Sequence, residues 1–121
     1  MSKLLVVDDE MAILEALTDI LAVEGYEVAT AANGAEGLER TVSERPDLIL
    51  LDMMMPVMDG QEMLRRLKED PELRKIPVVV MSAGRVTKAE LQGSRFLAKP
   101  FELDDLLGAV AEELERARAR A

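Results

Sequence analysis

Charged and hydroxyl side chains stand at the ends of four short apolar runs in this sequence. They are Asp8, Asp9 and Glu10 after the first run, Asp52 after the third, Ser82 at the end of the fourth and Lys99 after the fifth. Carboxylates that converge repel one another unless a cation lies among them. Repulsion between Asp9 and Asp52 is therefore expected to raise the pKa of at least one of these two carboxyl groups when no metal is bound. Mg²⁺ accepts carboxylate oxygens and leaves room for a phosphate oxygen. The set therefore favours phosphoryl transfer onto a carboxylate.

Five apolar runs alternate with segments of helical periodicity, and these runs are the elements that must position the functional side chains. They span residues 3–7, 26–31, 48–51, 76–81 and 96–98. Their Val, Ile and Leu content without polar alternation predicts strands buried on both faces of a sheet. The alternation of strand and helix predicts an α/β fold, a doubly wound five-stranded parallel sheet with right-handed crossovers. In the order 2-1-3-4-5 the first and third strands lie side by side, so their acidic ends meet at the carboxyl edge.

Apolar residues spaced three or four apart predict the intervening helices. They are Ile13, Leu14, Leu17, Ile20 and Leu21, then Leu38 and Val42, then Met63, Leu64 and Leu67, and finally Leu103, Leu106, Leu107, Val110 and Leu114. Gly25 is expected to end the first helix. Asn33 with Glu36, and Asp59 with Glu62, have the spacing of capping pairs at the starts of the second and third helices.

The fourth helix is predicted to be short. Thr87 and Glu90 have the spacing of a capping box, and Gly93 suits the left-handed residue that ends a helix. These signals bracket residues 88–92, a length of about 7.5 Å at about 1.5 Å per residue. So short a helix depends on packing, and this one holds only two apolar residues. We expect fewer than two turns, weakly anchored.

Composition excludes several classes of function. The 121 residues predict one domain over residues 1–121, and the formal charge of −9 disfavours direct nucleic-acid binding. Cys and His are absent, which excludes disulfides, zinc fingers, thiol nucleophiles and Ser-His-Asp triads. No apolar run approaches the ~18 residues of a membrane span, and no targeting segment is visible. We therefore expect a cytoplasmic protein without membrane insertion.

Each of the functional candidates also has a purely structural explanation. Asp8, Asp9 and Glu10 suit the N-terminus of a helix, whose dipole favours acidic residues. Asp52 and Ser82 suit caps or turns, and a Lys-Pro pair suits an exposed loop. The methionines at positions 53, 54, 55 and 58 indicate packing rather than a soft-metal site, because Cys and His are absent. The combination of four strand ends on one side of one sheet nevertheless favours a functional site.

Four segments, in order, resemble response-regulator receiver domains over essentially the whole chain. They are residues 4–10, LLVVDDE; residues 46–56, PDLILLDMMMP, with Asp59 and Gly60; residues 81–83, MSA; and residues 97–101, LAKPF. The resemblance implies the flavodoxin-like (βα)5 fold of that family. It also implies a phosphorylation-dependent signalling switch.

The resemblance implies a role for each matching position. Asp52 is the expected phosphoacceptor, which takes its phosphoryl group from a phosphohistidine on a histidine kinase or phosphotransfer protein. The expected Mg²⁺ ligands are Asp8, largely through water, Asp9, Asp52 and the backbone carbonyl of Met54. The residues expected to contact the phosphoryl oxygens are Lys99, Ser82 and Ala83. Ser82 and Phe96 are expected to move together as the switch, and the Lys99–Pro100 peptide bond is expected to be cis.

The chain departs from the family pattern between the fourth and fifth strands. Only seventeen positions separate Ser82 from Lys99, several fewer than is usual in the family. The shortening falls on the fourth helix, a common output surface. It removes no residue of the expected phosphorylation site.

Three other functions fit the residues less well. A pseudo-receiver would be an unphosphorylated protein–protein module, and the complete set of acidic, Ser and Lys residues argues against it. An aspartyl-phosphate hydrolase of the haloacid-dehalogenase type would have Asp-x-Asp after its first strand, which the sequence DDEM at residues 8–11 does not match. A calcium-binding domain would need an Asp-rich loop of about twelve residues, which the sequence lacks. The favoured interpretation is a signalling module that acts on a downstream effector. It catalyses its own phosphorylation and its own slow dephosphorylation.

Overall fold

Five parallel strands form the centre of the computed structural model, which describes residues 1–120. They are β1 (Lys3–Val7), β2 (Glu27–Ala31), β3 (Leu48–Asp52), β4 (Val78–Ser82) and β5 (Arg95–Ala98), in the spatial order β2-β1-β3-β4-β5. β1 therefore lies beside β3, with Leu5 opposite Ile49 and Val7 opposite Leu51. The predicted doubly wound α/β fold with this strand order is confirmed.

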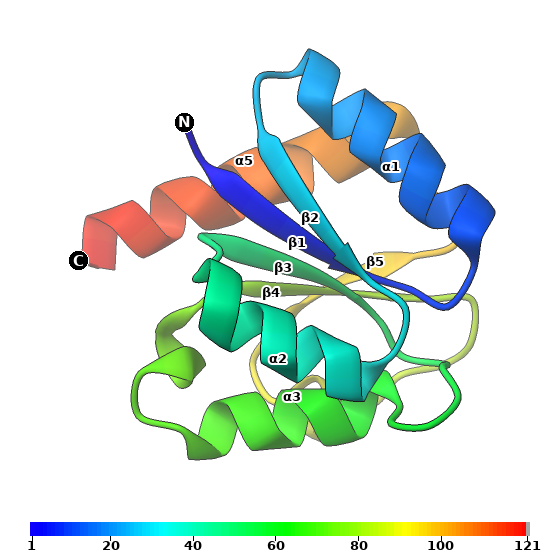
Figure 1. Ribbon diagram of the computed structural model, residues 1–121, viewed down its shortest axis with the longest axis vertical. Coiled ribbons are helices and arrows are strands. Elements are labelled where there is room, and N and C mark those ends of the chain that lie inside the picture. Colours follow the sequence, from blue (N-terminus) through cyan, green and yellow to red (C-terminus); the bar gives the residue numbers. More distant parts are fainter. Residues whose placement is uncertain (121) are drawn as a thin grey trace.

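Helices cover both faces of this sheet, as Figure 1 shows. They are α1 (Met11–Val23), α2 (Gly34–Glu44), α3 (Gly60–Glu69), α4 (Lys88–Leu91) and α5 (Leu103–Arg120), with a 3-10 turn, η1 (Leu73–Lys75), before β4. α1 and α5 share one buried cluster that includes Leu14 and Val110, whereas α3 packs on the opposite face through Leu64 and Leu67. Among the helices of residues 1–120, none is long and apolar enough to cross a membrane.

Burial distinguishes the inner strands from the edge strands. All five residues of β3 and of β4 are buried, and in β1 only Lys3 is partly exposed. β2 and β5 each contain a single buried residue, Ala31 and Leu97. The expectation of strands buried on both faces is therefore correct for the three inner strands and wrong for the two edges, where one side of the strand has no neighbour.

The predicted helix boundaries are confirmed at three positions. The side-chain oxygen of Asn33 accepts a hydrogen bond from the N–H of Glu36 at 2.9 Å. Asp59 accepts one from the N–H of Glu62 at 2.9 Å, so both capping pairs satisfy a first-turn N–H. Gly25 follows α1 with a φ of 91°, a left-handed conformation that glycine adopts without steric cost.

β4 begins two residues later than the apolar run predicts. Residues 73–75 form η1, whose end is fixed by the N–H of Ile76 donating to the carbonyl of Leu73 at 3.1 Å. Pro77 follows and has no N–H to offer a neighbouring strand. The strand therefore starts at Val78, and Ile76 packs beside the core instead.

α4 is a single turn of four residues, none of them buried. Thr87 Oγ1 accepts a hydrogen bond from the N–H of Glu90 at 3.1 Å, and Glu90 Oε1 accepts one from the N–H of Thr87 at 3.0 Å. The predicted capping box and short fourth helix are thus confirmed. The left-handed backbone starts at Gln92, with a φ of 48°, one residue before Gly93. The helix accordingly ends at Leu91, one residue earlier than predicted.

Gly60 opens α3 in close contact with the end of β3. A Cβ atom here would clash with the backbone oxygen of Asp52 and lie 2.7 Å from the Cα of Met53. Gly60→Ala should therefore lower the free energy of unfolding by about 1–3 kcal/mol in urea titrations. Gly108→Ala in α5 is the control, since its Cβ would meet only Glu112 Oε1 at 3.7 Å, and a helical alanine is more stable than glycine by up to about 1 kcal/mol. Equal stability of the two variants would contradict this account of the α3 contact.

α4 is expected to exchange its amide protons faster than the other helices. Its last two N–H groups, at Leu91 and Gln92, donate to Thr87 and Lys88, and none of the four helical residues is buried. NMR hydrogen exchange at Leu91 should be at least about tenfold faster than at Val110, which is fully buried in α5. Comparable rates at the two positions would show that α4 is anchored better than its contacts indicate.

Candidate functional site

Four strand ends bring functional side chains to one edge of the sheet. Asp52 and Ser82 are the last residues of β3 and β4, and Asp8 and Lys99 directly follow β1 and β5. Asp8, Asp52 and Ser82 are buried, and the side chain of Lys99 is 17% exposed. The strands run in parallel, so these ends lie on the same side of the molecule (Figure 1).

The ammonium group of Lys99 lies between two buried carboxylates. Its Nζ donates a hydrogen bond to Asp8 Oδ2 at 3.0 Å and lies 3.4 Å from Asp52 Oδ1. The backbone N–H of Lys99 also donates to the carbonyl of Ser82 at 2.9 Å, which extends the pairing of β4 with β5 by one step. The sheet therefore fixes the backbone position from which the Lys99 side chain extends towards both acids.

Asp8 is held by the backbone on either side of its side chain. Its own N–H donates to the carbonyl of Ala31 at 3.1 Å, and its Oδ1 accepts a hydrogen bond from the N–H of Glu10 at 3.0 Å. Because Lys99 occupies Oδ2, both carboxylate oxygens are hydrogen-bonded. Asp8 has no exposed surface, and these contacts compensate the burial of its charge.

The buried charges shift one another's protonation. Burial raises the pKa of the Asp52 carboxyl above its ordinary value of 3.8, and the negative charge of Asp8 raises it further, against the opposing effect of Lys99. Burial alone would lower the pKa of the Lys99 ammonium, but the two carboxylates outweigh it and raise that pKa. The neighbour that raises the Asp52 pKa is thus Asp8, not Asp9 as the sequence suggested, because Asp9 is exposed to screening water.

The aspartates at this edge fit a hard divalent cation. One carboxylate oxygen from each of Asp8, Asp9 and Asp52 lies within 4.8 Å of the others. These donors are all oxygens, and the single ammonium of Lys99 does not balance three carboxylates. Asp9 is exposed, which leaves the cluster open to water and to an incoming phosphate oxygen. This donor set matches the ligand preference of Mg²⁺.

The remaining candidates lie on or just after β3, β4 and β5. Ser82 Oγ accepts a hydrogen bond from the N–H of Gly84 at 3.1 Å, which leaves its proton available to donate. Met54 is 74% exposed, and Ala83 is exposed beside Ser82. Phe96 lies on edge strand β5 and is 36% exposed. The Lys99–Pro100 peptide bond is cis.

Comparison with known proteins identifies the family. A family model for the response regulator receiver domain matches residues 4–111 of this chain. The chain belongs to that family. Receiver domains of two-component systems are phosphorylated by histidine kinases and pass signals to effectors. They generally bind Mg²⁺ at an acidic cluster, which this receiver domain forms from Asp8, Asp9 and Asp52.

Curated relatives of this receiver domain include proteins of very different length. Sporulation initiation phosphotransferase F of Bacillus subtilis (strain 168) is 41% identical over 117 residues, and the match covers 93% of each chain. Response regulator PleD of Caulobacter vibrioides (strain NA1000 / CB15N) is 42% identical over 120 residues, 95% of this chain but 26% of PleD. Response regulator MprA of Mycobacterium ulcerans (strain Agy99) is 37% identical over 121 residues, 96% of this chain and 51% of MprA.

Solved structures show the same architecture. A CheY-like response regulator receiver domain protein from Methanospirillum hungatei JF-1 superposes with a TM-score of 0.90 at 29% identity, covering 100% of this chain and 99% of that one. Chemotaxis protein CheY4 of Vibrio cholerae gives a TM-score of 0.86 at 32% identity, covering 93% and 98%.

Two features of the site were not predicted from the sequence. The direct ion pair between Lys99 and Asp8 joins residues 91 positions apart, whereas the sequence indicated only a positive charge opposite the carboxylates and a contact with a phosphoryl group. The shared carboxyl edge was the one signal that related the two residues, because β3 and β4 lie between β1 and β5 in the strand order. The close approach of Gly60 to β3, where its N–H donates to the carbonyl of Met53 at 3.1 Å, was also missed, because Asp59 was interpreted as a helix cap and Gly60 only as part of the family resemblance.

The raised pKa of Asp52 predicts a pH-dependent stability in metal-free protein. A carboxyl with a raised pKa binds its proton more tightly when folded, so this contribution to stability is present below 3.8 and is lost as pH rises through the folded pKa. Asp52→Asn should therefore melt higher than the wild type at pH 7 in EDTA, by about 2–8 °C, with the gap closing towards pH 4.

Asp19→Asn is the matched control, because it removes an exposed carboxylate from α1. Its melting temperature should equal that of the wild type at every pH. Mg²⁺ should raise the melting temperature of the wild type and close most of its gap to Asp52→Asn at pH 7. A wild type that melts above Asp52→Asn at pH 7 without metal would contradict the assigned repulsion.

Proposed function

We propose that this receiver domain, over residues 1–121, is phosphorylated on Asp52 and acts as a phosphorylation-dependent switch. The observation that carries the proposal is the ammonium of Lys99, which lies 3.4 Å from Asp52 and 3.0 Å from Asp8. A fixed cation beside Asp52 stabilises the negative charge of a phosphoryl group attached there. The donor is a phosphohistidine on a histidine kinase or phosphotransfer protein, as for the receiver family. This chain contains no His, so the donor histidine lies on another protein.

The reaction assigned to Asp52 is nucleophilic attack on phosphorus. An oxygen of the ionised carboxylate bonds to phosphorus while the bond from phosphorus to the donor's imidazole nitrogen breaks, and the imidazole keeps the electron pair. Asp8, Asp9, Asp52 and the backbone carbonyl of Met54 would hold Mg²⁺, which would supply positive charge to the phosphoryl oxygens. Removing that charge is expected to abolish transfer, since the carboxylates would otherwise repel the incoming anion.

Three groups of the chain receive the transferred phosphoryl oxygens. The Lys99 ammonium exchanges part of its contact with the two acids for a phosphoryl oxygen. The hydroxyl of Ser82 donates a second hydrogen bond, and Ala83 supports a third through its backbone N–H, since it is exposed beside Ser82. These contacts exist only in the phosphorylated state, so they bias the equilibrium between two conformations.

Ser82 is suited to carry the change outward. Its hydroxyl now contacts the N–H of Gly84 at 3.1 Å, and turning towards the phosphoryl group replaces that bond. Its backbone carbonyl still accepts the hydrogen bond from the N–H of Lys99, which connects β4 to β5. Phe96 lies on β5 and is exposed, so its inward movement with Ser82 alters the surface offered to a downstream effector.

Intact-mass spectrometry tests the phosphoacceptor. With acetyl phosphate and Mg²⁺, the wild type should gain one phosphoryl group, and Asp52→Asn should gain none, because an amide is not a nucleophile. Asp19→Asn should be modified like the wild type, since Asp19 is exposed on α1. An unmodified wild type would favour the pseudo-receiver alternative. Equal modification of Asp52→Asn would assign the phosphoryl group to another residue.

The lifetime of the phosphoryl group provides a second prediction. Hydrolysis needs a water in line with the bond from Asp52 to phosphorus, and the exposed flanking positions, Met54 and Gly84, offer no side-chain group to orient it. Met54→Asn should speed loss of the phosphoryl group by roughly tenfold, because an amide can hold that water. Met54→Leu is the control and should leave the rate unchanged. A decay as slow in Met54→Asn as in Met54→Leu would remove Met54 from this role.

A further inference from the structure

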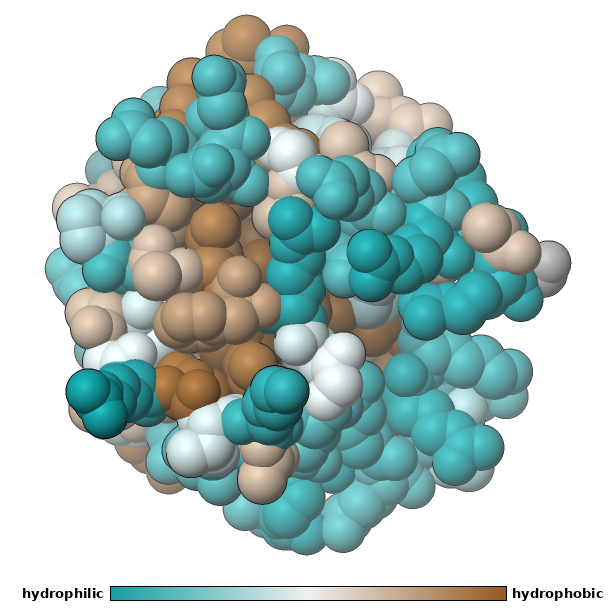
Figure 2. Space-filling view, turned by 180° about the vertical axis from the view of Figure 1, so that it is seen from behind, coloured by the Kyte–Doolittle hydropathy of each residue, from teal (hydrophilic) through white to brown (hydrophobic). Residues whose placement is uncertain are grey.

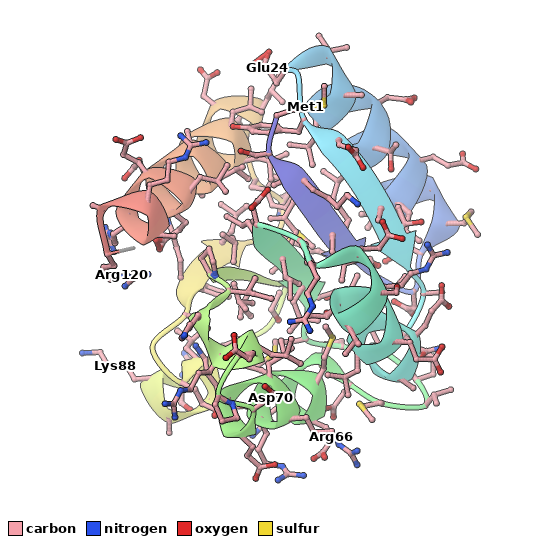
Figure 3. All side chains as sticks on the ribbon, turned by 60° about the vertical axis from the view of Figure 1, so that its left-hand side comes forward. Met1, Glu24, Arg66, Asp70, Lys88 and Arg120 are labelled. Atoms are coloured by element: carbon pink, nitrogen blue, oxygen red, sulfur yellow. The ribbon has the colours of Figure 1, made fainter. Side chains whose placement is uncertain are left out.

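A cavity of about 570 Å³ lies at the edge of the sheet opposite to the aspartates. Its walls come from the end of α3, from η1, from the amino ends of β4 and β5 and from the last turns of α5. In Figure 2 a hollow beside the C-terminal end of α5 has apolar atoms at its floor and hydrophilic side chains along its borders. Figure 3 labels Arg120, the cavity residue at the end of α5.

Positive charge is concentrated around this cavity. Its cationic residues are Lys68, Arg74, Lys75, Arg95, Arg116 and Arg120. They are six of the fifteen Lys and Arg residues of a chain whose formal charge is −9, and the only acidic residue in the lining is Glu113. The cavity therefore carries a charge opposite to that of the whole molecule.

Most of these cations lack a compensating anion. Arg95 pairs with Glu112 at 3.2 Å, and Arg116 lies 3.8 Å from Glu113. The other four cationic residues make no ion pair within residues 1–120. Burial lowers the pKa of the Lys68 ammonium, and repulsion by the positive charge of Arg120 lowers it further. An anion bound here would relieve that repulsion.

The lining also suits the organic part of an anion. Ile76, Pro77, Val78 and Ala117 add apolar surface beside the cations. Cations along the border and an apolar floor together match a ligand with a charged end and an apolar end.

We propose that this cavity binds a small organic phosphate of the nucleoside diphosphate class. The phosphates contact Arg74, Arg120 and Lys68, and the organic part lies on the apolar floor. The volume suits a compact ligand, and the negative charge of the rest of the molecule disfavours a long polyanion such as a nucleic acid. The site is separate from Asp52, so its existence does not depend on phosphorylation.

Isothermal titration calorimetry with ADP tests the proposal in EDTA, where no metal links the nucleotide to the aspartates. The wild type should bind one ADP with a submillimolar Kd. A double variant, Arg74→Gln with Arg120→Gln, should bind at least about tenfold more weakly. The matched control, Arg40→Gln with Arg118→Gln, removes the same charge outside the cavity and should bind within about twofold of the wild type. Asp52→Asn should bind ADP like the wild type.

Pyrophosphate and NMR distinguish the remaining outcomes. Pyrophosphate should bind more weakly than ADP, because it cannot use the apolar floor, and ADP should shift the amide signals of Gly93 and Ser94 in the wild type. Absence of ADP binding by the wild type, equal weakening in both double variants, or unshifted Gly93 and Ser94 signals would overturn the proposal. Pyrophosphate binding as tightly as ADP would overturn the assignment to an organic ligand.

Discussion

The contact of one ammonium group with two buried carboxylates constrains the rest of this molecule. Asp8 and Asp52 are almost completely removed from water, and two carboxylates in that environment favour protonation unless a cation is present. Lys99 supplies one positive charge, at 3.0 Å from Asp8 and 3.4 Å from Asp52, and the exposed Asp9 adds a third negative charge nearby. The cluster is held together but keeps an excess of negative charge. That excess attracts a metal ion and leaves a carboxylate able to attack phosphorus.

The buried parallel sheet maintains that contact. The fully buried strands β3 and β4 place Asp52 and Ser82 at fixed positions, and the backbone bond from Lys99 to Ser82 aligns β5 with them. Gly60 lets α3 begin directly against the end of β3, where any side chain would displace the backbone of Asp52. The rigidity of the core and the geometry of the site therefore share the same residues. The shortened α4 buries no residue, so its reduction leaves this arrangement intact.

The sequence predicted the features that local chemistry determines. The Asn33 and Asp59 caps and the Thr87–Glu90 capping box are local signals, and each appears as predicted. The apolar runs also form the five strands, although β4 starts two residues late and the edge strands β2 and β5 are less buried than expected. The features that were missed depend on distant residues. The ion pair of Lys99 with Asp8 spans 91 positions, η1 precedes the fourth apolar run and β4 starts only at Val78, and the basic cavity gathers residues from α3, η1, β5 and α5. No local pattern of spacing reports such contacts.

Lys99 stabilises two buried acids through its charge, and a double-mutant cycle in EDTA tests this role most directly. Lys99→Met should lower the free energy of unfolding by about 3–5 kcal/mol in the wild type, because it leaves two buried carboxylates without a cation. In an Asp8→Asn background the same substitution should cost at least about 1 kcal/mol less, because one of the two charges is already gone. Urea unfolding of the four proteins measures both costs. An equal loss in the two backgrounds would show that Lys99 stabilises the fold by packing rather than through its charge.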